Sequence, residues 1–351
     1  MMDGYALVWC DGAFGTPNGK TAHGLVRFTE RYEVRGVVDR RHAGYDAGEV
    51  LDGVAKGIPV FADVGAAFTT LRASGQLTHF VIGIAPDGGR LTDHDRAAVR
   101  AALSSGLHVD CGLHDFLSED PELAAVARAH GVQLRDVRKP PPIGELHHFS
   151  GRIEEVGARR FAVLGTDSAV GKRTTTVLLT QGFRARGLTA EMIGTGQTAW
   201  LQGVRYGIVL DSLINDFVAG ELEHAVVRAW DEVRPDVVVV EGQGSLMNPA
   251  YPGGFEILAA TRPHGIVMQH APARAEYDGF PGYALHPLAT QIRAMELVSG
   301  REVRAVTLNH EGLTRDEART AAEAIEQELG LVCCDPLWDG VERVVDALMR
   351  S

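Results

Sequence analysis

One segment of this 351-residue chain constrains its fold more than any other. The short apolar run Phe161–Leu164 is followed by Gly165, five further residues and then Gly171-Lys172. Such a loop joins a buried strand to the start of a helix, and it turns successive backbone N–H groups toward one anion. The helix N-terminus and the lysine add positive charge. The segment therefore predicts a strand–loop–helix unit that binds phosphate groups.

Two departures from the common phosphate-loop pattern narrow the choice of ligand. Five residues separate Gly165 from Gly171, where four are usual. Arg173 follows Lys172 at the position where a Ser or Thr hydroxyl usually binds Mg²⁺, and Thr174 lies about 100° further round the helix. These departures disfavour chemistry on a Mg²⁺–triphosphate.

A second cationic donor can instead bind a phosphate bidentately, which suits coenzyme A with its pyrophosphate and 3′-phosphate. We expect ligand contacts along the whole loop, from Gly165, Thr166, Asp167, Ser168, Ala169, Val170, Gly171, Lys172, Arg173 and Thr174.

The remaining pattern predicts an α/β protein of two domains. Short runs rich in Val and Ile alternate with helical stretches in both halves, which indicates parallel sheets covered by helices. The pattern stops at Lys139-Pro140-Pro141-Pro142, because proline fixes φ and lacks an N–H. We predict an N-terminal Rossmann-like parallel sheet over residues 1–138, a linker over 139–159, and a C-terminal P-loop NTPase-like parallel sheet over 160–351.

The expected strands are Tyr5–Cys10, Val34–Val38, Phe80–Ile84, Leu107–Asp110, Phe161–Leu164, Ala190–Ile193, Val237–Val240, Gly265–Gln269, Val303–Thr307 and Leu331–Cys333. The expected helices are Ala66–Ser74, Asp93–Ser104, Lys172–Arg186 and Asp216–Trp230.

The first strand of the N-terminal half ends in a glycine turn with Gly12 and Gly15, and Asp39 ends the next strand. The turn reads Gly-x-x-Gly, whereas dinucleotide-binding domains carry Gly-x-Gly-x-x-Gly. We therefore predict a Rossmann-like domain with no demonstrated cofactor, and a dehydrogenase ranks last among the functions considered. Lys20 and His23 follow in a loop from which they could reach a ligand, although solvated side chains explain them better.

Composition excludes several classes of partner. The formal net charge of −12 disfavours binding to nucleic acid. No run reaches the ~18 apolar residues of a membrane span, and the four cysteines form no regular framework. We expect a cytoplasmic protein with reduced, buried thiols and no metal ligands, which binds small molecules as a homo-oligomer.

Carboxylates at strand and helix ends in the second half are candidate general bases. Glu241 follows the β-branched run Val237–Val240, and ligands of open parallel sheets bind outside the carboxyl ends of strands. Asp211 and Asp216 precede and open a helix, where a simple capping role explains either acid. A positioned acid is what a site that handles an amine needs, and these three acids are the candidates for that role.

Polar residues after the other strands of this half are candidate ligand contacts. Asn309 ends a late strand, where an amide can both donate to and accept from an adenine edge. Arginines can bind a substrate carboxylate, although isolated arginines are mostly solvated. The expected substrate-binding residues are Thr195, Gln197, Thr198, Arg205, Gln243, Ser245, His270 and Arg274.

Four features together resemble the D-glutamate N-acetyltransferase family, long described as a domain of unknown function. They are the loop Gly165–Thr174, Gly194-Thr-Gly-Gln-Thr198, Glu241-Gly-Gln-Gly-Ser245 and the Rossmann-like first half. The resemblance spans nearly the whole chain, and the Lys-Arg-Thr variant of the loop is its most specific part. It implies acetyl-CoA as the donor and a D-amino acid, D-glutamate, as the acceptor.

Two other functions stay open from the sequence. The spacing of the loop resembles dethiobiotin synthetase, in which Asn309 would match an adenine-reading residue, so the chain could be an ATP- and Mg²⁺-dependent ligase or kinase. Arg173 argues against that function. The third possibility is a nucleotide-binding protein without catalytic activity.

Overall fold

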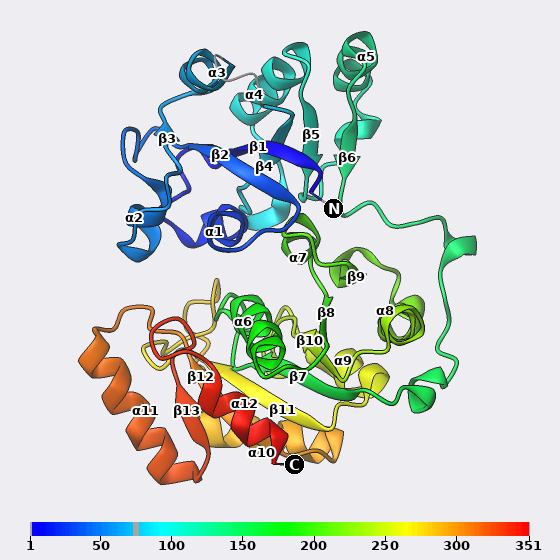
Figure 1. Ribbon diagram of the computed structural model, residues 1–351, viewed down its shortest axis with the longest axis vertical. Helices are drawn as coiled ribbons and strands as arrows, with labels where there is room; N and C mark the ends of the chain where they lie inside the picture. Colours follow the sequence, from blue (N-terminus) through cyan, green and yellow to red (C-terminus); the bar gives the residue numbers. More distant parts are fainter. Residues whose placement is uncertain (1, 73–76, 351) are drawn as a thin grey trace. The chain divides into compact units, whose positions relative to one another are not determined.

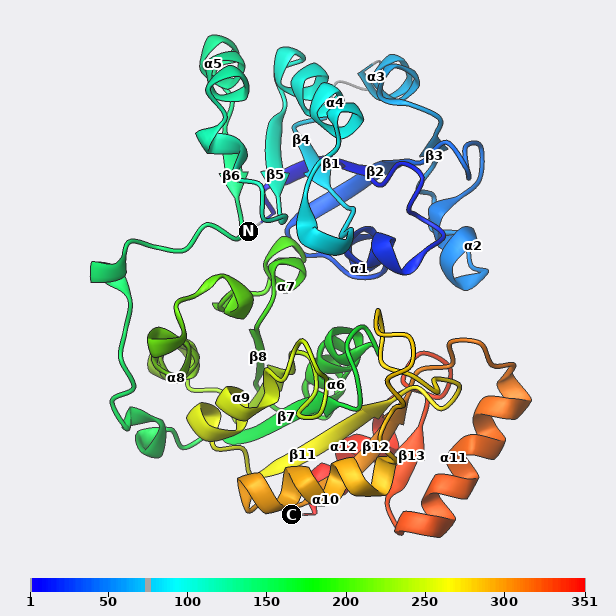
Figure 2. The same cartoon turned by 180° about the vertical axis from the view of Figure 1, so that it is seen from behind.

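The computed structural model describes residues 2–72 and 77–350. They form two compact units, Met1–Pro140 with Gln197–Val204, and Pro141–Gly196 with Arg205–Ser351 (Figures 1 and 2). Both units are α/β, with parallel sheets of six and seven strands. The predicted fold class is confirmed. Each unit is described by itself below.

The first unit has the strand order β3-β2-β1-β4-β5-β6, and every neighbouring pair is parallel. This is the order of a Rossmann fold. The strands are β1 (Gly4–Trp9), β2 (Tyr32–Val38), β3 (Val60–Phe61), β4 (His79–Ile82), β5 (His108–Cys111) and β6 (Leu134–Asp136).

The helices of the first unit are α1 (Lys20–Arg27), α2 (Ala47–Asp52), α3 (Val64–Arg72), α4 (Asp93–Ser104), α5 (Pro121–His130) and α7 (Gln197–Leu201). The bounds of α4 match those predicted, because Thr92 and Asp95 form a capping box that fixes its first turn. The predicted end of the preceding helix, Ser74, lies outside the described residues. Three 3₁₀ turns complete the unit: η1 (Pro17–Gly19), η2 (Asp87–Gly89) and η3 (Leu117–Glu119).

The second unit has the parallel strand order β13-β12-β11-β7-β10-β8-β9. Its strands are β7 (Arg159–Gly165), β8 (Ala190–Gly194), β9 (Tyr206–Gly207), β10 (Val237–Glu241), β11 (Gly265–His270), β12 (Val303–Leu308) and β13 (Val332–Cys334). Its helices are α6 (Lys172–Ala185), α8 (Asn215–Val233), α9 (Gly254–Thr261), α10 (Leu288–Ser299), α11 (Arg315–Leu329) and α12 (Glu342–Met349). Its 3₁₀ turns are η4 (Ile143–Glu145), η5 (Arg152–Glu155) and η6 (Leu210–Ser212).

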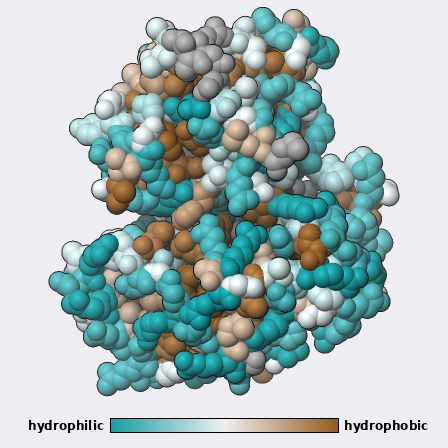
Figure 3. Space-filling view, in the orientation of Figure 1, coloured by the Kyte–Doolittle hydropathy of each residue, from teal (hydrophilic) through white to brown (hydrophobic). Residues whose placement is uncertain are grey.

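Alternate side chains of β7 pack into two different apolar cores of the second unit. Ala162 and Leu164 of β7 belong to one apolar cluster, and Phe161 and Val163 belong to another. Because successive side chains point to opposite faces, the two clusters lie on opposite faces of the sheet. Outside these cores the face seen in Figure 3 is mostly hydrophilic, with scattered apolar residues. Apolar residues at successive positions of β7 therefore pack on both faces of the sheet, which explains why this strand is buried.

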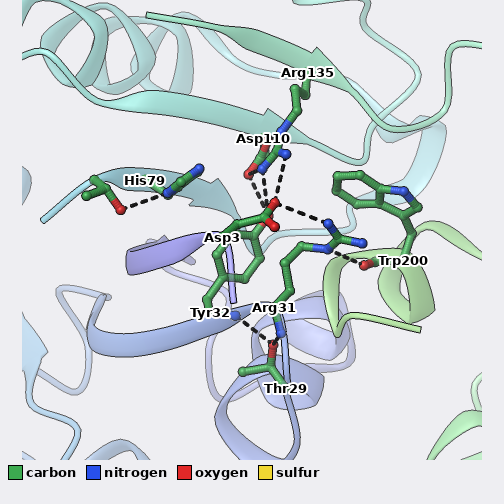
Figure 4. A network of polar contacts seen from close by, with 9 residues as sticks. Asp3, Thr29, Arg31, Tyr32, His79, Asp110, Arg135 and Trp200 are labelled. Atoms are coloured by element: carbon green, nitrogen blue, oxygen red, sulfur yellow. Dashed lines mark hydrogen bonds and ion pairs between the residues drawn. The ribbon is translucent and has the colours of Figure 1, made fainter. Parts of the chain in front are cut away.

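The segment Gln197–Val204 packs with the first unit, although the sequence analysis assigned it to the second domain. The Arg31 guanidinium lies 3.8 Å over the Trp200 ring, and its Nε donates to the Trp200 carbonyl at 2.8 Å (Figure 4). Gln202 Nε2 donates to the carbonyls of Gly24 and Phe28. These contacts are non-local and leave no local pattern in the sequence.

A buried ion pair anchors the same region of the first unit (Figure 4). The Asp110 carboxylate is fully buried, and it accepts hydrogen bonds from Tyr32 Oη at 2.5 Å and Arg135 Nη2 at 2.7 Å. Arg135 also pairs with Asp3 at 2.8 Å. A buried carboxylate is tolerated only when it is paired in this way.

The four cysteines are all buried and form no disulfide. Within residues 2–72 and 77–350, no helix has the length and apolar character that a membrane crossing requires.

Candidate functional site

The phosphate loop connects β7 to α6 at the middle of the second sheet. β7 ends at Gly165 and lies between β10 and β11. The loop therefore lies at the topological switch point of the sheet, where ligands of open α/β sheets bind. Ala169 and Gly171 have φ of 53° and 102°, and Gly171 is the N-cap of α6. Left-handed residues in such a loop turn backbone N–H groups into a concave nest for an anion. Ala169 is the strained member, since a residue with a Cβ rarely adopts this conformation.

Lys172 opens α6 and is buried against its own loop. Its Nζ donates to the Asp167 carbonyl at 2.6 Å. Gly165 makes room for this side chain, because a Cβ there would stand 2.9 Å from a Val170 methyl and 3.1 Å from Lys172 Cδ. Arg173 and Thr174 are half-buried on the same turn. The loop therefore gathers two cations at a helix N-terminus.

Asp167 holds the loop to two distant segments. Its carboxylate is fully buried and accepts hydrogen bonds from Asn248 Nδ2 at 2.9 Å, from the Asp278 N–H at 2.8 Å and from Arg274 Nη1 at 2.9 Å. The adjacent Ser168 N–H donates to it as well, at 2.7 Å. A carboxylate with this many donors is a structural brace, so Asp167 shapes the phosphate site through the backbone.

All three nitrogens of the Arg274 guanidinium contact the loop or Glu311. Nη1 also donates to the Ser168 carbonyl at 2.7 Å, and Nη2 lies 3.5 Å from the Ala169 carbonyl. Nε and Nη2 contact the Glu311 carboxylate at 3.3 and 2.7 Å. Although burial alone lowers the pKa of Arg274, its bonds to Glu311 and Asp167 leave that pKa above the ordinary value. All five donors of the side chain have partners, so Arg274 supports the loop in this structure.

Glu241 lies at the carboxyl end of β10, next to β7 in the sheet. It is buried, and its Oε2 accepts a hydrogen bond from the Thr195 N–H at 2.9 Å, while Thr195 Oγ1 donates to the Glu241 carbonyl at 3.1 Å. Burial raises the pKa of Glu241, and the charges of Arg173 and Lys172 act in the opposite direction. Both cations of the loop therefore favour the charged form of this acid.

The turn after Glu241 brings two further predicted residues to this place. Gln243 Nε2 donates to the Thr195 carbonyl at 3.0 Å. Gly244 has φ of 52°, and a Cβ there would stand 1.7 Å from the Tyr251 carbonyl oxygen, so only glycine fits. The Ser245 hydroxyl oxygen is buried and has no hydrogen-bond partner among the described residues. Buried hydroxyls nearly always have a partner, so this oxygen is a candidate ligand contact.

The strands on the other side of β7 contribute His270 and Asn309. His270 Nδ1 lies 3.1 Å from Thr166 Oγ1, and burial lowers the His270 pKa to about 4. The Asn309 N–H donates to the His270 carbonyl at 2.8 Å. Its side-chain nitrogen lies 3.9 Å from the point where a Cβ of Gly171 would be. The structure thus brings Asn309 to the phosphate loop.

Five predicted site residues belong to elements other than the loop and the strand ends described above. Arg205 pairs with Glu232 at 2.5 Å near the end of α8. Asp211 and Asp216 are exposed, in η6 and in the first turn of α8. Gln197 and Thr198 belong to α7 of the first unit, where Thr198 Oγ1 lies 2.9 Å from Thr21 Oγ1.

The sequence analysis missed Gln269 and Asn248, two buried amides that organise the site. Gln269 Oε1 accepts from Thr175 Oγ1 at 2.5 Å and from Thr307 Oγ1 at 2.6 Å, and its backbone carbonyl accepts from the Thr166 N–H at 3.0 Å. The sequence did carry a signal for Gln269, because a polar residue inside the otherwise apolar run Gly265–His270 indicates a buried side chain that needs hydrogen-bond partners. Asn248 gave no such signal, because it lies in an irregular loop.

No metal cluster is present in the described part of the chain, where no group of three or more His, Cys, Asp and Glu residues could hold an ion.

Comparison with known proteins identifies relatives over most of the chain. A D-glutamate N-acetyltransferase of Tritonibacter scottomollicae is 32% identical over 301 residues, which cover 82% of this chain and 86% of that protein. A D-glutamate N-acetyltransferase of a Pseudoalteromonas species is 29% identical over 276 residues, covering 76% and 80%. The crystal structure of a DUF1611 family protein from Anabaena variabilis superposes with a TM-score of 0.91 at 29% identity, over 99% of this chain and all of that one.

Family models match both halves. Residues 40–140 match the "Domain of unknown function (DUF1611_N) Rossmann-like domain", and residues 147–345 match the "Domain of unknown function (DUF1611_C) P-loop domain". Since the second match alone spans more than half of the chain, and the arrangement of the phosphate loop agrees with it, this protein belongs to the DUF1611 family.

Proposed function

We propose that this protein transfers an acetyl group from acetyl-CoA to the amino group of D-glutamate. One observation carries the proposal. In the phosphate loop, Arg173 occupies the position after Lys172 where the usual loop has a Ser or Thr hydroxyl that binds Mg²⁺. The two relatives named D-glutamate N-acetyltransferase support the reaction and the acceptor.

The loop suits the donor because of its charge and shape. The nest formed around Ala169 and Gly171 offers backbone N–H groups, and Lys172 with Arg173 adds two positive charges. A pyrophosphate can be held there without any phosphoryl group being transferred. Asn309, next to Gly171, is the proposed contact for the adenine ring.

The transfer itself requires a neutral amine. The acceptor ammonium first loses a proton, and its nitrogen then attacks the thioester carbonyl carbon and forms a C–N bond. The C–S bond breaks and the CoA sulfur leaves as a thiolate with the electron pair. The nitrogen gives up a second proton, which the thiolate takes up, and the products are the neutral amide and the CoA thiol. Among Glu241, Asp211 and Asp216, Glu241 is the best candidate base, because it is buried beside the loop and its pKa is raised. The other two acids are exposed.

Donors near Glu241 are the proposed stabilisers of the tetrahedral oxyanion. The Thr195 N–H is engaged with Glu241, and the Ser245 N–H with the Tyr251 carbonyl. The Ser245 hydroxyl, which has no partner among the described residues, is therefore the proposed donor to the substrate.

Calorimetry on the purified protein tests the donor first. We expect acetyl-CoA to bind without Mg²⁺, and Lys172→Ala and Arg173→Ala to weaken binding. Arg186→Ala is the matched control, because Arg186 lies at the other end of α6 and pairs with Asp346 at an exposed site. Release of CoA thiol is then followed with D-glutamate, L-glutamate and no acceptor, and Glu241→Gln should abolish turnover while leaving acetyl-CoA bound. Preferential binding of Mg²⁺–ATP, or acetyl-CoA affinity unchanged by Lys172→Ala, would overturn the proposal.

A further inference from the structure

A histidine paired with a buried acid lies just beyond the carboxyl ends of β12 and β13, which are neighbours in the second sheet (Figures 1 and 2). His310 Nδ1 lies 2.6 Å from Asp335 Oδ2. The Asp335 side chain is 3% exposed, and its Oδ1 accepts from the N–H groups of Leu337 and Trp338 at 2.9 and 3.2 Å. Because a carboxylate accepts and does not donate, Nδ1 of the imidazole carries the proton. The function proposed above gives this pair no role.

The imidazole ring of His310 is held in place but has one nitrogen unused. The ring stacks on the Trp338 indole, with centroids 3.7 Å apart and planes 9° apart. The His310 side chain is 28% exposed, and its Nε2 makes no hydrogen bond to any residue that the structure describes. When a carboxylate orients a histidine through one nitrogen, the other nitrogen is available to a ligand.

A second cationic side chain lies beside the same indole. Arg315 is the first residue of α11, and its guanidinium carbon lies 5.3 Å from the centre of the Trp338 ring. Arg315 is exposed and pairs with no acid in residues 2–72 and 77–350. The positive end of the helix dipole adds to its charge. A guanidinium and an imidazole that can be protonated therefore meet at one aromatic ring, and both groups bind phosphate well.

The acids at the start of α11 are already engaged. Glu317 belongs to the capping box of this helix, and Asp316 pairs with Arg319 at 2.8 Å. The charge of Arg315 is therefore available to an anionic ligand.

The residues on either side of His310 contact the phosphate loop of the same unit. The Asn309 amide nitrogen lies 3.9 Å from the position that a Cβ of Gly171 would take. Glu311 pairs with Arg274 at 2.7 Å, and that guanidinium bonds to carbonyl groups of the loop. Since consecutive Cα atoms are about 3.8 Å apart, His310 lies next to the phosphate loop.

We propose that His310 and Arg315 bind the 3′-phosphate of coenzyme A, and so select this donor over nucleotides that lack that group. The proposal rests on the proposed acetyl transfer and deepens it. With the pyrophosphate on the loop and the adenine at Asn309, the ribose that joins them lies beside His310. The imidazole takes up a proton at Nε2 and donates a hydrogen bond to the phosphate, while Asp335 balances the charge of the ring. A site built to bond one group discriminates strongly against analogues without it.

Calorimetry with coenzyme A and 3′-dephospho-coenzyme A tests this site, because the two ligands differ only in the 3′-phosphate. We expect the unmodified protein to bind coenzyme A at least about tenfold more tightly. His310→Asn and Arg315→Ala should each lower that ratio by about threefold or more, and leave the affinity for 3′-dephospho-coenzyme A within about twofold. The amide in His310→Asn can still donate to Asp335, so the buried acid keeps a partner.

Arg319→Ala is the matched control. It removes the same charge from the same helix, but at a residue that pairs with Asp316 at an exposed site. Its ratio of affinities should stay within about twofold of the unmodified protein. Equal affinity of the unmodified protein for the two ligands, or equal weakening of both ligands in His310→Asn, would overturn the proposal. A loss of selectivity in Arg319→Ala as large as in Arg315→Ala would do the same, because it would indicate a general effect of charge.

A pair of nucleotides without a thioester separates the 3′-phosphate site from the acetyl transfer. 3′-Phosphoadenosine 5′-diphosphate and ADP again differ only in the 3′-phosphate. If the unmodified protein transfers no acetyl group, the proposed function fails, and this comparison still decides whether the site exists. Tighter binding of the 3′-phosphorylated nucleotide that is lost in His310→Asn supports the site, and equal binding of the two nucleotides overturns it.

Discussion

Arg274 Nη1 lies 2.9 Å from the buried Asp167 Oδ2, which joins residues that are 107 positions apart in the sequence. The same guanidinium contacts the carbonyls of Ser168 and Ala169. The strained middle of the phosphate loop is therefore held from outside by one side chain.

Removing this brace should cost both stability and ligand binding. In Arg274→Ala the Asp167 carboxylate stays buried with a missing partner, so we expect about 3 kcal/mol less free energy of unfolding. The affinity for acetyl-CoA should fall at least about tenfold, because the loop loses its shape. Chemical denaturation and calorimetry measure the two effects.

The control for that variant is Glu311→Ala, which removes the more exposed partner of Arg274. It should change stability by less than about 1 kcal/mol. Equal effects of the two substitutions would show that the guanidinium contacts to the loop are unimportant.

Replacing Arg173 by serine should change the choice of ligand. The serine hydroxyl stands where ordinary phosphate loops bind Mg²⁺, and the loss of a charged donor should weaken acetyl-CoA binding by about 2 kcal/mol, or thirtyfold. We expect Mg²⁺–ATP affinity to rise in Arg173→Ser. Parallel titrations with both ligands measure the exchange, and an unchanged preference would contradict it.

Gly244→Ala tests the turn that carries Ser245. A Cβ would collide with the Tyr251 carbonyl, and φ of 52° disfavours any other residue, so the free energy of unfolding should fall by at least about 3 kcal/mol. Gly253→Ala serves as the comparison, since its Cβ would meet its nearest neighbour at 3.4 Å. Thermal unfolding of the two variants should differ clearly, whereas similar melting temperatures would speak against the described turn.

His270 should make stability depend on pH below neutrality. Burial lowers its pKa from 6.5 to about 4 in the folded protein, so the unfolded chain binds a proton between these values and the folded protein does not. Its stabilising contribution is complete above pH 6.5, decreases as the pH falls to about 4, and amounts to at most about 3 kcal/mol.

The pH dependence of unfolding in His270→Asn checks that contribution. The variant should lose less stability than the unmodified protein between pH 6.5 and 4, because Asn does not titrate. Urea unfolding at several pH values gives the two slopes, and identical slopes would exclude His270 as their source.

Local patterns predicted the elements that carry the site. The apolar run, two glycines and lysine gave the strand, loop and helix start at Gly165 and Lys172, since each residue type has its own backbone requirement. Glu241 was found in the same way, because the carboxyl ends of parallel strands face one edge. Arg274 was recognised as a candidate for the site, but its contacts with the loop were not.

The sequence by itself therefore determined the fold class, the phosphate loop and the residue types around it, all of which depend on neighbours within a few positions. The tertiary structure decided that Gln269 and Asn248 organise the loop, that Gln197–Val204 packs with the first unit, and that Asp335 pairs with His310. These outcomes depend on which strands and loops become neighbours. Strand order and side-chain pairing are long-range choices, and local periodicity carries no record of them.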